Sequence, residues 1–250
     1  MGSDRRGLKM KIRIFKNMEF WESLSKYNKD IIEVYNKIDK KDCTWWFDPN
    51  RVSDLEIRVN FSTNLLRLTP NAINKRFKLI MHPSNYLTLW LINLLYSDNK
   101  DILIEDIYCG MGRLIFYLSK LGFTNFHAID NFSQIKQYIF EALMKKGNIK
   151  NYRLNNEEFG LAVFPKIINL VGYPFYFKPE GAKEKFPLNC ELVCMYPQLN
   201  IQKTFIEKIL IPNNYVKLCS DEDTFQIAYC NKDIYNKFYN KIKEYKINEY

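Results

Sequence analysis

Two glycines and one acid, placed around predicted strands, carry the clearest chemical signal in the sequence. Gly110 and Gly112 lie between a short apolar stretch and a helical pattern, in the segment 106–112 (DIYCGMG). Glycine suits a backbone that must take a positive φ or approach a ligand, and the N–H groups at the start of a following helix can bind that ligand. Asp130 follows the next predicted strand. An acid at this spacing from a glycine turn can bind the ribose hydroxyls of an adenosine.

The region that would position these residues alternates strand and helix patterns from residue 101 onward, which is typical of a mostly parallel sheet covered by helices. Apolar stretches predict strands over 102–108 and 125–129. Helical spacing predicts helices over 113–121, ending at Gly122, and over 133–146, with Ser133 as N-cap and Gly147 as C-cap.

The rest of the chain has weaker patterns. Helices are predicted over 18–39 and from Pro83–Ser84 to Tyr96, with a moderate strand pattern over 55–61 between them. Beyond residue 150, an aromatic, proline-bearing insertion follows a possible strand over 166–171. The remaining patterns predict strands over 191–195, 215–218 and 225–229, and helices over 201–210 and from Asp233 onward.

The segment 106–112 resembles the first motif of the class I S-adenosylmethionine-dependent methyltransferases, which commonly reads D-x-G-x-G-x-G or D-L-G-C-G-T-G. Asp106, Cys109, Gly110 and Gly112 match the second form position by position. Tyr108 stands where that form has its first glycine, a departure that affects the loop beside the cofactor.

This resemblance implies S-adenosylmethionine as the cofactor and methyl transfer as the reaction. It places Asp106 near the methionine amino group, Gly110 and Gly112 against the cofactor, and Asp130 on the ribose. The implied fold class is α/β: a Rossmann-like methyltransferase sheet with helices on both faces, preceded by a mainly helical N-terminal region. Residues 1–100 would form a cap or substrate region, and residues 101–250 the cofactor-binding domain, with an insertion at about 157–188.

A dinucleotide is the competing cofactor. The G-x-G-x-x-G pattern of NAD- and FAD-binding proteins would require a third glycine at position 115, where this chain has Ile115. The sequence therefore favours S-adenosylmethionine over NAD or FAD. The plain alternative is an ordinary turn between strand and helix, with Asp130 as a surface acid.

Catalytic residues are not identified by the sequence. His82 precedes a predicted helix and could act as a base, although a histidine bonded to backbone at a helix entry is the favoured interpretation. Tyr196 lies in residues 195–198 (MYPQ), which we place at the end of the fourth strand, and could border an acceptor pocket. Asn155 and Asn156 are candidates for a cofactor contact at the third strand end, although asparagines that form a turn explain them as well.

Two methyltransferase subclasses are disfavoured by their missing motifs. Amino methyltransferases that act on adenine or cytosine carry an N/D/S-P-P-Y/F motif, and residues 195–198 (MYPQ) lack it. The spelling of the first motif also resembles that of 5-methyluridine RNA methyltransferases, which use a D-P-P-R motif and a nucleophilic cysteine. The D-P-P-R motif is absent. Cys219 lies near the position of the nucleophilic cysteine, but we interpret it as a buried thiol.

The acceptor is left open by the composition. A formal net charge of +9 favours RNA or DNA slightly, because lysine and arginine release counterions from phosphates. An AT-rich genome, which enriches Lys together with Asn, Ile and Tyr, explains the charge equally well. A small-molecule acceptor, or a methyltransferase-like subunit that binds without catalysing, remains an alternative. The aromatic cluster at Trp45–Phe47 could stack a base or pack in a core.

The compartment follows from what the sequence lacks. Six cysteines are scattered without a CxxC pair, which argues against a zinc site and for reduced thiols. No apolar run reaches the ~18 residues of a membrane span, and the first residues do not read as a secretory signal. We therefore expect a cytoplasmic protein that binds no metal and no membrane; the oligomeric state is not indicated.

Overall fold

The computed structural model describes residues 10–16, 18–37, 79–81, 85–107, 109–130, 134–155, 165–170, 190–195, 204–224 and 226–247. Most of the predicted N-terminal region and insertion, including the strand pattern over 55–61, lies outside these ranges. No helix in the described part of the chain is both long enough and apolar enough to cross a membrane.

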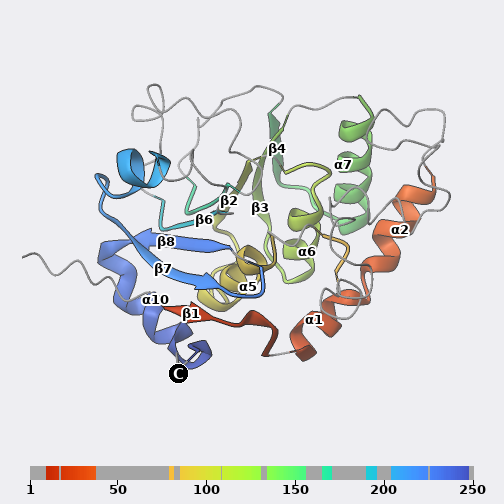
Figure 1. Cartoon of the computed structure of the whole chain (residues 1–250). Helices are drawn as coiled ribbons and strands as arrows, with labels where there is room; N and C mark the ends of the chain where they lie inside the picture. The colour runs from red at the N-terminus through yellow and green to blue at the C-terminus, as the bar shows by residue number, and fades with distance from the viewer. Residues whose placement is uncertain are drawn as a thin grey trace, which may run out of the picture.

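A single mixed sheet organises the described residues (Figure 1). Its eight strands lie in the order β1-β7-β8-β6-β5-β2-β3-β4. Only β8 runs antiparallel to its neighbours, β6 and β7. The strands are β1 (Lys11–Ile12), β2 (Leu103–Ile107), β3 (Asn125–Ile129), β4 (Tyr152–Asn155), β5 (Ile167–Asn169), β6 (Leu192–Met195), β7 (Tyr215–Asp221) and β8 (Ile227–Asn231).

The strand order reverses between β2 and β5. From β2 the chain adds β3 and then β4 on one side, and β5 then returns to pair with the other side of β2. In open α/β sheets, ligands bind outside the carboxyl ends of the strands at such a switch point. The carboxyl ends of β2 and β5 are therefore where a ligand site is expected.

Both faces of the sheet are covered, which explains why its central strands are almost continuously apolar. One face, with Ile104 and Phe126, packs against helices α5 (Tyr86–Leu95), α6 (Arg113–Lys120), α7 (Gln134–Gly147) and α10 (Tyr235–Ile242). The opposite face, with Ile107 and Ile129, packs against the short helical segment η5 (Ile206–Leu210). The predicted α/β, Rossmann-like fold class is confirmed.

The N-terminal segment joins this sheet instead of standing apart from it. β1 pairs in parallel with β7 at the sheet edge, and the Asp221 carboxylate accepts the Ile14 N–H beside it. The helix predicted over 18–39 is two helices, α1 (Met18–Ser25) and α2 (Asn28–Asn36), separated by a turn. The ring of Trp21 lies 5.0 Å from that of Tyr86 on α5, and the Trp21 indole donates to the Ile14 carbonyl.

The predicted elements around the glycine motif agree closely with the structure. β3 has the predicted bounds, and β2 and α6 end within one residue of them. At the end of α7 the prediction is wrong: Gly147 is the last helical residue, and Asn148 takes the left-handed conformation at φ 55°. Asparagine tolerates that conformation better than most residues, so Asn148 ends the helix one residue beyond the predicted Gly147.

Gly112 is required by the packing of α6 on α7. Its φ is +74°, and a Cβ built on it would lie 2.6 Å from the Phe140 ring and 3.0 Å from the Met144 methyl, both on α7. The missing side chain therefore allows the start of α6 to approach α7. Gly122 also has a positive φ, +91°, but the nearest atom to its Cβ would be 4.0 Å away.

These two glycines give a matched test of packing against backbone strain. We expect Gly112→Ala to lower the free energy of unfolding by about 2–4 kcal/mol, because the strain of a positive φ adds to overpacking. Gly122→Ala should cost only about 1–2 kcal/mol, from the strain alone. Urea denaturation of both variants measures the difference, and equal losses would contradict the clash with α7.

Candidate cofactor site

The turn between β2 and α6 is held by its own backbone. The Cys109 N–H donates to the Ile129 carbonyl of β3, and the Gly112 N–H donates to the Cys109 carbonyl. Gly110 has a φ of +59° and Gly112 stands at the N-cap of α6. Both glycines therefore have the positive φ that the sequence analysis predicted for them. Tyr108 lies outside the described residues.

Asp130 and this turn are joined directly. The Asp130 Oδ2 accepts the Gly110 N–H at 2.7 Å, which links the end of β3 to the glycine turn. A Cβ built on Gly110 would have nothing within 4 Å, so the described residues leave space beside this backbone. The structure therefore brings the predicted residues Gly110 and Asp130 together, next to an open position.

Asp106 is a buried carboxylate near the carboxyl end of β2. Its side chain is 1% exposed, and its Oδ1 accepts a hydrogen bond from the Asn169 amide at 2.7 Å. Its Oδ2 is buried and has no hydrogen-bond partner among the described residues. Burial raises the pKa of Asp106 to about 7; the Asn169 hydrogen bond opposes this rise, and the nearby Asp130 charge adds to it.

Asn169 is a central residue of this site that the sequence analysis did not identify. It is the registered neighbour of Asp106 across the β2–β5 pair, at the switch point of the sheet. Its amide also donates to Asn85, and its carbonyl accepts from the Thr88 hydroxyl at 2.8 Å. Gln226, immediately before β8, donates to that same hydroxyl. A polar residue in the middle of the predicted strand 166–171 was the available signal.

The strand count used to place the acceptor side was also wrong. Counted along the chain from β2, the fourth strand is β5, which pairs with β2 and ends at Asn169. Met195 ends β6, the fifth, which pairs with β5. Residues 195–198 therefore do not follow the fourth strand, and Tyr196 itself lies outside the described residues.

The other predicted positions are distributed as follows. His82, Asn156 and the Trp45–Phe47 cluster lie outside the described residues, and Asn155 is the last residue of β4. Cys219 is fully buried within β7, and burial raises its thiol pKa well above the usual range, which agrees with a buried, unreactive thiol. Side chains of α7 occupy the space that a Cβ on Gly112 would need, so a direct contact between Gly112 and the cofactor stays a prediction.

A second buried acid lies on the opposite face of the sheet. Glu105 on β2 faces His127 on β3, with the Glu105 Oε1 and the His127 Nδ1 2.9 Å apart. Burial raises the Glu105 pKa, and the bond to His127 opposes the rise. Because side chains alternate along a strand, this pair cannot contact a ligand held by Asp106 from the other face.

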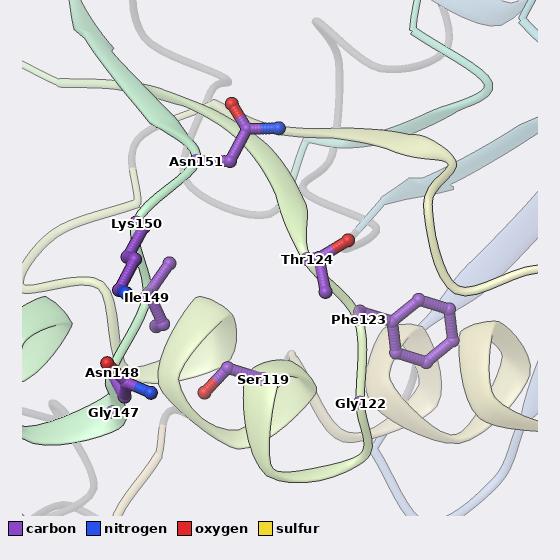
Figure 2. A pocket seen from close by; sticks show the side chains of 9 residues that line it. All are labelled: Ser119, Gly122, Phe123, Thr124, Gly147, Asn148, Ile149, Lys150 and Asn151. Atoms are coloured by element: carbon purple, nitrogen blue, oxygen red, sulfur yellow. The ribbon is translucent and has the colours of Figure 1, made fainter.

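The structure also has a cavity of about 430 Å³ far from the motif (Figure 2). It lies between the ends of α6 and α7 and the beginnings of β3 and β4, and Ser119, Phe123, Asn148 and Lys150 are among its lining residues. Asp130 follows the opposite end of β3. The cavity is therefore separate from the candidate cofactor site.

The buried Asp106 makes a prediction about the stability of the protein without a ligand. Its folded-state pKa is raised from 3.8 to about 7, so protonation stabilises the fold at low pH, and that contribution is lost as pH rises toward 7. Asp106→Asn removes the titration. We expect the variant to gain on the order of 2 kcal/mol over the native chain between pH 5 and pH 8.

Urea denaturation at both pH values measures this gain, and a constant offset between the two proteins cancels in the comparison. Asp98→Asn, at an exposed acid, is the control and should show no such change. A difference between Asp106→Asn and the native chain that is the same at both pH values would contradict a raised pKa.

Comparisons with known proteins found similar solved structures, but no matching protein-family model and no curated protein that matches in sequence. Similar solved structures include a ribosomal protein L11 methylase from Lactobacillus delbrueckii subsp. bulgaricus (19% identity, 59% of this chain and 80% of that one, TM-score 0.43). An rRNA methylase from Streptococcus thermophilus shares 12% identity over 58% of this chain and 95% of that one, with a TM-score of 0.42. A precorrin-6y C5,15-methyltransferase from Geobacter metallireducens GS-15 shares 14% identity over 55% of this chain and 73% of that one, also with a TM-score of 0.42. By its own sheet order and first motif, the chain has a Rossmann-like α/β fold that resembles the class I S-adenosylmethionine-dependent methyltransferases.

Proposed function

We propose that the protein is an S-adenosylmethionine-dependent methyltransferase that binds its cofactor at the carboxyl ends of β2 and β3. The observation that carries this proposal is the hydrogen bond between Asp130 and the Gly110 N–H, at 2.7 Å. It sets a carboxylate beside an open glycine turn at the switch point of the sheet, where adenosine-containing ligands bind in doubly wound folds.

The residues present suit the chemical groups of this cofactor. The unpartnered Oδ2 of Asp106 is an acceptor for an ammonium group. Asp130 can accept ribose hydroxyls, because each carboxylate oxygen has two lone pairs. The space beside Gly110 admits a ligand close to the backbone. Asp106, Asp130 and Gly110 therefore each suit a different part of the cofactor.

The work of the protein in this reaction is alignment. The cofactor supplies a methyl group on a sulfonium, which a nucleophile can displace directly. Holding donor and acceptor in line accounts for much of the rate enhancement in such reactions. Asp106 and Asp130 would fix the two ends of the cofactor. In this proposal the acceptor approaches beside α5 and β5, which Asn169 joins to Asp106 through its hydrogen bonds.

For the acceptor we propose a nucleic acid, on the basis of charge. The net charge is +9, and basic side chains gather along the C-terminal helical stretch η6 (Lys232–Ile234), α10 and η7 (Lys243–Tyr245). Its lysines are Lys232, Lys237, Lys241 and Lys243, with Lys246 directly after η7, against the two acids Asp233 and Glu244. All but Lys241 are exposed, so they are available to phosphates.

The cofactor proposal is tested by calorimetric titration with S-adenosylhomocysteine. We expect binding by the native chain, and binding about 10- to 150-fold weaker in Asp130→Ala, which corresponds to the ~1.5–3 kcal/mol of a hydrogen bond to a charged group. Asp98→Ala, an exposed acid away from the motif, should bind as the native chain does. Heat with NAD but not with S-adenosylhomocysteine, or binding indifferent to Asp130, would contradict the proposal.

The acceptor proposal is tested by salt dependence. We expect RNA or DNA affinity that falls steeply with salt, and a log–log slope that becomes shallower by about two contacts in a Lys237→Ala, Lys243→Ala double variant. Lys16→Ala, Lys29→Ala makes the same charge change on exposed lysines elsewhere and should leave the slope unchanged. Affinity undetectable at low salt would move the proposal to a small-molecule acceptor. Binding of nucleic acid and cofactor without transfer of labelled methyl would indicate a non-catalytic subunit.

A further inference from the structure

A chain of buried polar side chains leads from β8 through α5 and β5 to Asp106. Gln226 and Thr88 are 0% exposed, and Asn169 is 1% exposed. Gln226 bonds to Thr88 at 3.2 Å, Thr88 to Asn169 at 2.8 Å, and Asn169 to Asp106 at 2.7 Å. Buried polar groups are costly unless they are paired, so this chain needs a reason beyond packing.

The direction of every hydrogen bond in this chain is fixed by one backbone group. The Leu87 N–H, in the first turn of α5, can only donate, and it donates to the Gln226 Oε1 at 2.7 Å. The Gln226 amide nitrogen must therefore face Thr88 and donate to it. The Thr88 hydroxyl then donates onward to the Asn169 carbonyl oxygen, which turns the Asn169 amide nitrogen toward Asp106.

The result is a carboxyl group with one occupied and one available oxygen. The Asp106 Oδ1 accepts from Asn169, while the buried Oδ2 has no partner among the described residues. The described surroundings offer this group no cation: α5 contributes neutral Asn85 and Thr88, and Asp130 at the end of β3 carries the same sign. The Glu105–His127 pair faces the other side of the sheet.

Burial without a cation keeps the carboxyl group protonated up to about neutral pH, since it raises the Asp106 pKa to about 7. Because Oδ1 is already accepting a hydrogen bond, the proton resides on Oδ2. That is the oxygen that an ammonium group of the cofactor must reach.

We propose that Asn169, oriented by Thr88 and Gln226, is a positioning residue that couples cofactor binding to the release of one proton from Asp106. The proposal rests on the proposed function, because it takes the cofactor's α-ammonium as the cation. The O–H bond of the carboxyl group breaks and its proton passes to solvent. The ammonium keeps all of its protons and donates a hydrogen bond to Oδ2. An ion pair therefore replaces a neutral acid.

The pH dependence of binding has a definite sign. Below the pKa of Asp106, each unit of pH makes ionisation tenfold scarcer, so affinity falls as pH falls; above it, affinity is constant. Ligands without an ammonium group gain nothing from ionised Asp106. S-adenosylhomocysteine carries the amino-acid part, and 5′-methylthioadenosine keeps the adenosine but lacks it, so the two ligands separate the coupling from general effects of pH.

Calorimetry of both ligands between pH 6.0 and 8.5 tests the coupling in the native chain. We expect S-adenosylhomocysteine affinity to rise about tenfold over this range and 5′-methylthioadenosine affinity to stay constant. Titrations in buffers of different ionisation enthalpy should show close to one proton released per S-adenosylhomocysteine at pH 6.0 and almost none at 8.5. In Asp106→Asn, both the release and the pH dependence should disappear.

Variants of the chain test the positioning role. In Asn169→Ala, loss of the donor to Oδ1 should move the midpoint of the pH profile upward, and Thr88→Val should move it in the same direction by less. Thr88→Val replaces a hydroxyl by a methyl group of similar size, so it serves if Asn169→Ala does not fold. Tyr215→Phe is the control. It removes a buried hydroxyl that donates to the Cys190 carbonyl and takes no part in the hydrogen bonds from Gln226 to Asp106, so the midpoint should stay unchanged.

The outcomes distinguish the two proposals. S-adenosylhomocysteine binding that is independent of pH, or an unshifted midpoint in both Asn169→Ala and Thr88→Val, would overturn the positioning role and leave the cofactor assignment standing. Failure of both adenosyl ligands to bind at any pH would overturn the proposed function, and the coupling with it.

Discussion

The hydrogen bond from Asn169 to Asp106 connects the two strands at which the sheet changes direction. Parallel pairing sets these residues side by side, and their side chains share the face covered by α5. The glycine turn begins just after Asp106, and Asn169 also bonds Asn85, at the entry of α5. The relative position of turn, helix and sheet is thus fixed at one buried contact. If that contact were lost, Asp106 would retain its burial without its only described partner, which is the costlier state.

The two faces of β2 treat their buried acids differently. Glu105 has an imidazole on the neighbouring strand, a group that can take up a proton and become a counter-charge. Asp106 has an amide, which can donate a hydrogen bond but cannot change its own charge. The first acid therefore has a basic partner within the protein, whereas the second has only a neutral partner among the described residues and stays unbalanced when ionised. Such imbalance is tolerated at binding sites, where a ligand can supply what the fold omits.

The parts of this architecture that could be predicted from sequence are those set by nearby residues. Apolar runs located β2 and β3, helical spacing located α6 and α7, and the spacing between Gly112 and Asp130 located the end of the second strand. What the sequence could not reveal depends on distant partners. The role of Asn169 follows from β5 pairing with β2 rather than with its predecessor, β4. The restriction on Gly112 comes from Phe140 on another helix, and a two-residue strand such as β1 has no period to detect. Position along the chain was therefore a poor guide to strand number, which is why Met195 was assigned to the wrong strand.

The edge of the sheet at β1 has a consequence for the order of folding. Among the described residues, the backbone partners of β1 and of Met10 before it all come from late in the chain. On one side, Ser220 donates to the Met10 carbonyl and Glu222 to the Ile12 carbonyl. On the other side, Ile247 donates to the Lys11 carbonyl, and Lys246 bridges to Ile12 (Figure 1). A ribosome makes β1 before any of these partners, so β1 cannot complete its hydrogen bonds until residues after 245 have been made. β1 is thus among the last strands to join the sheet, and its docking closes an edge that would otherwise remain open to pairing with another chain.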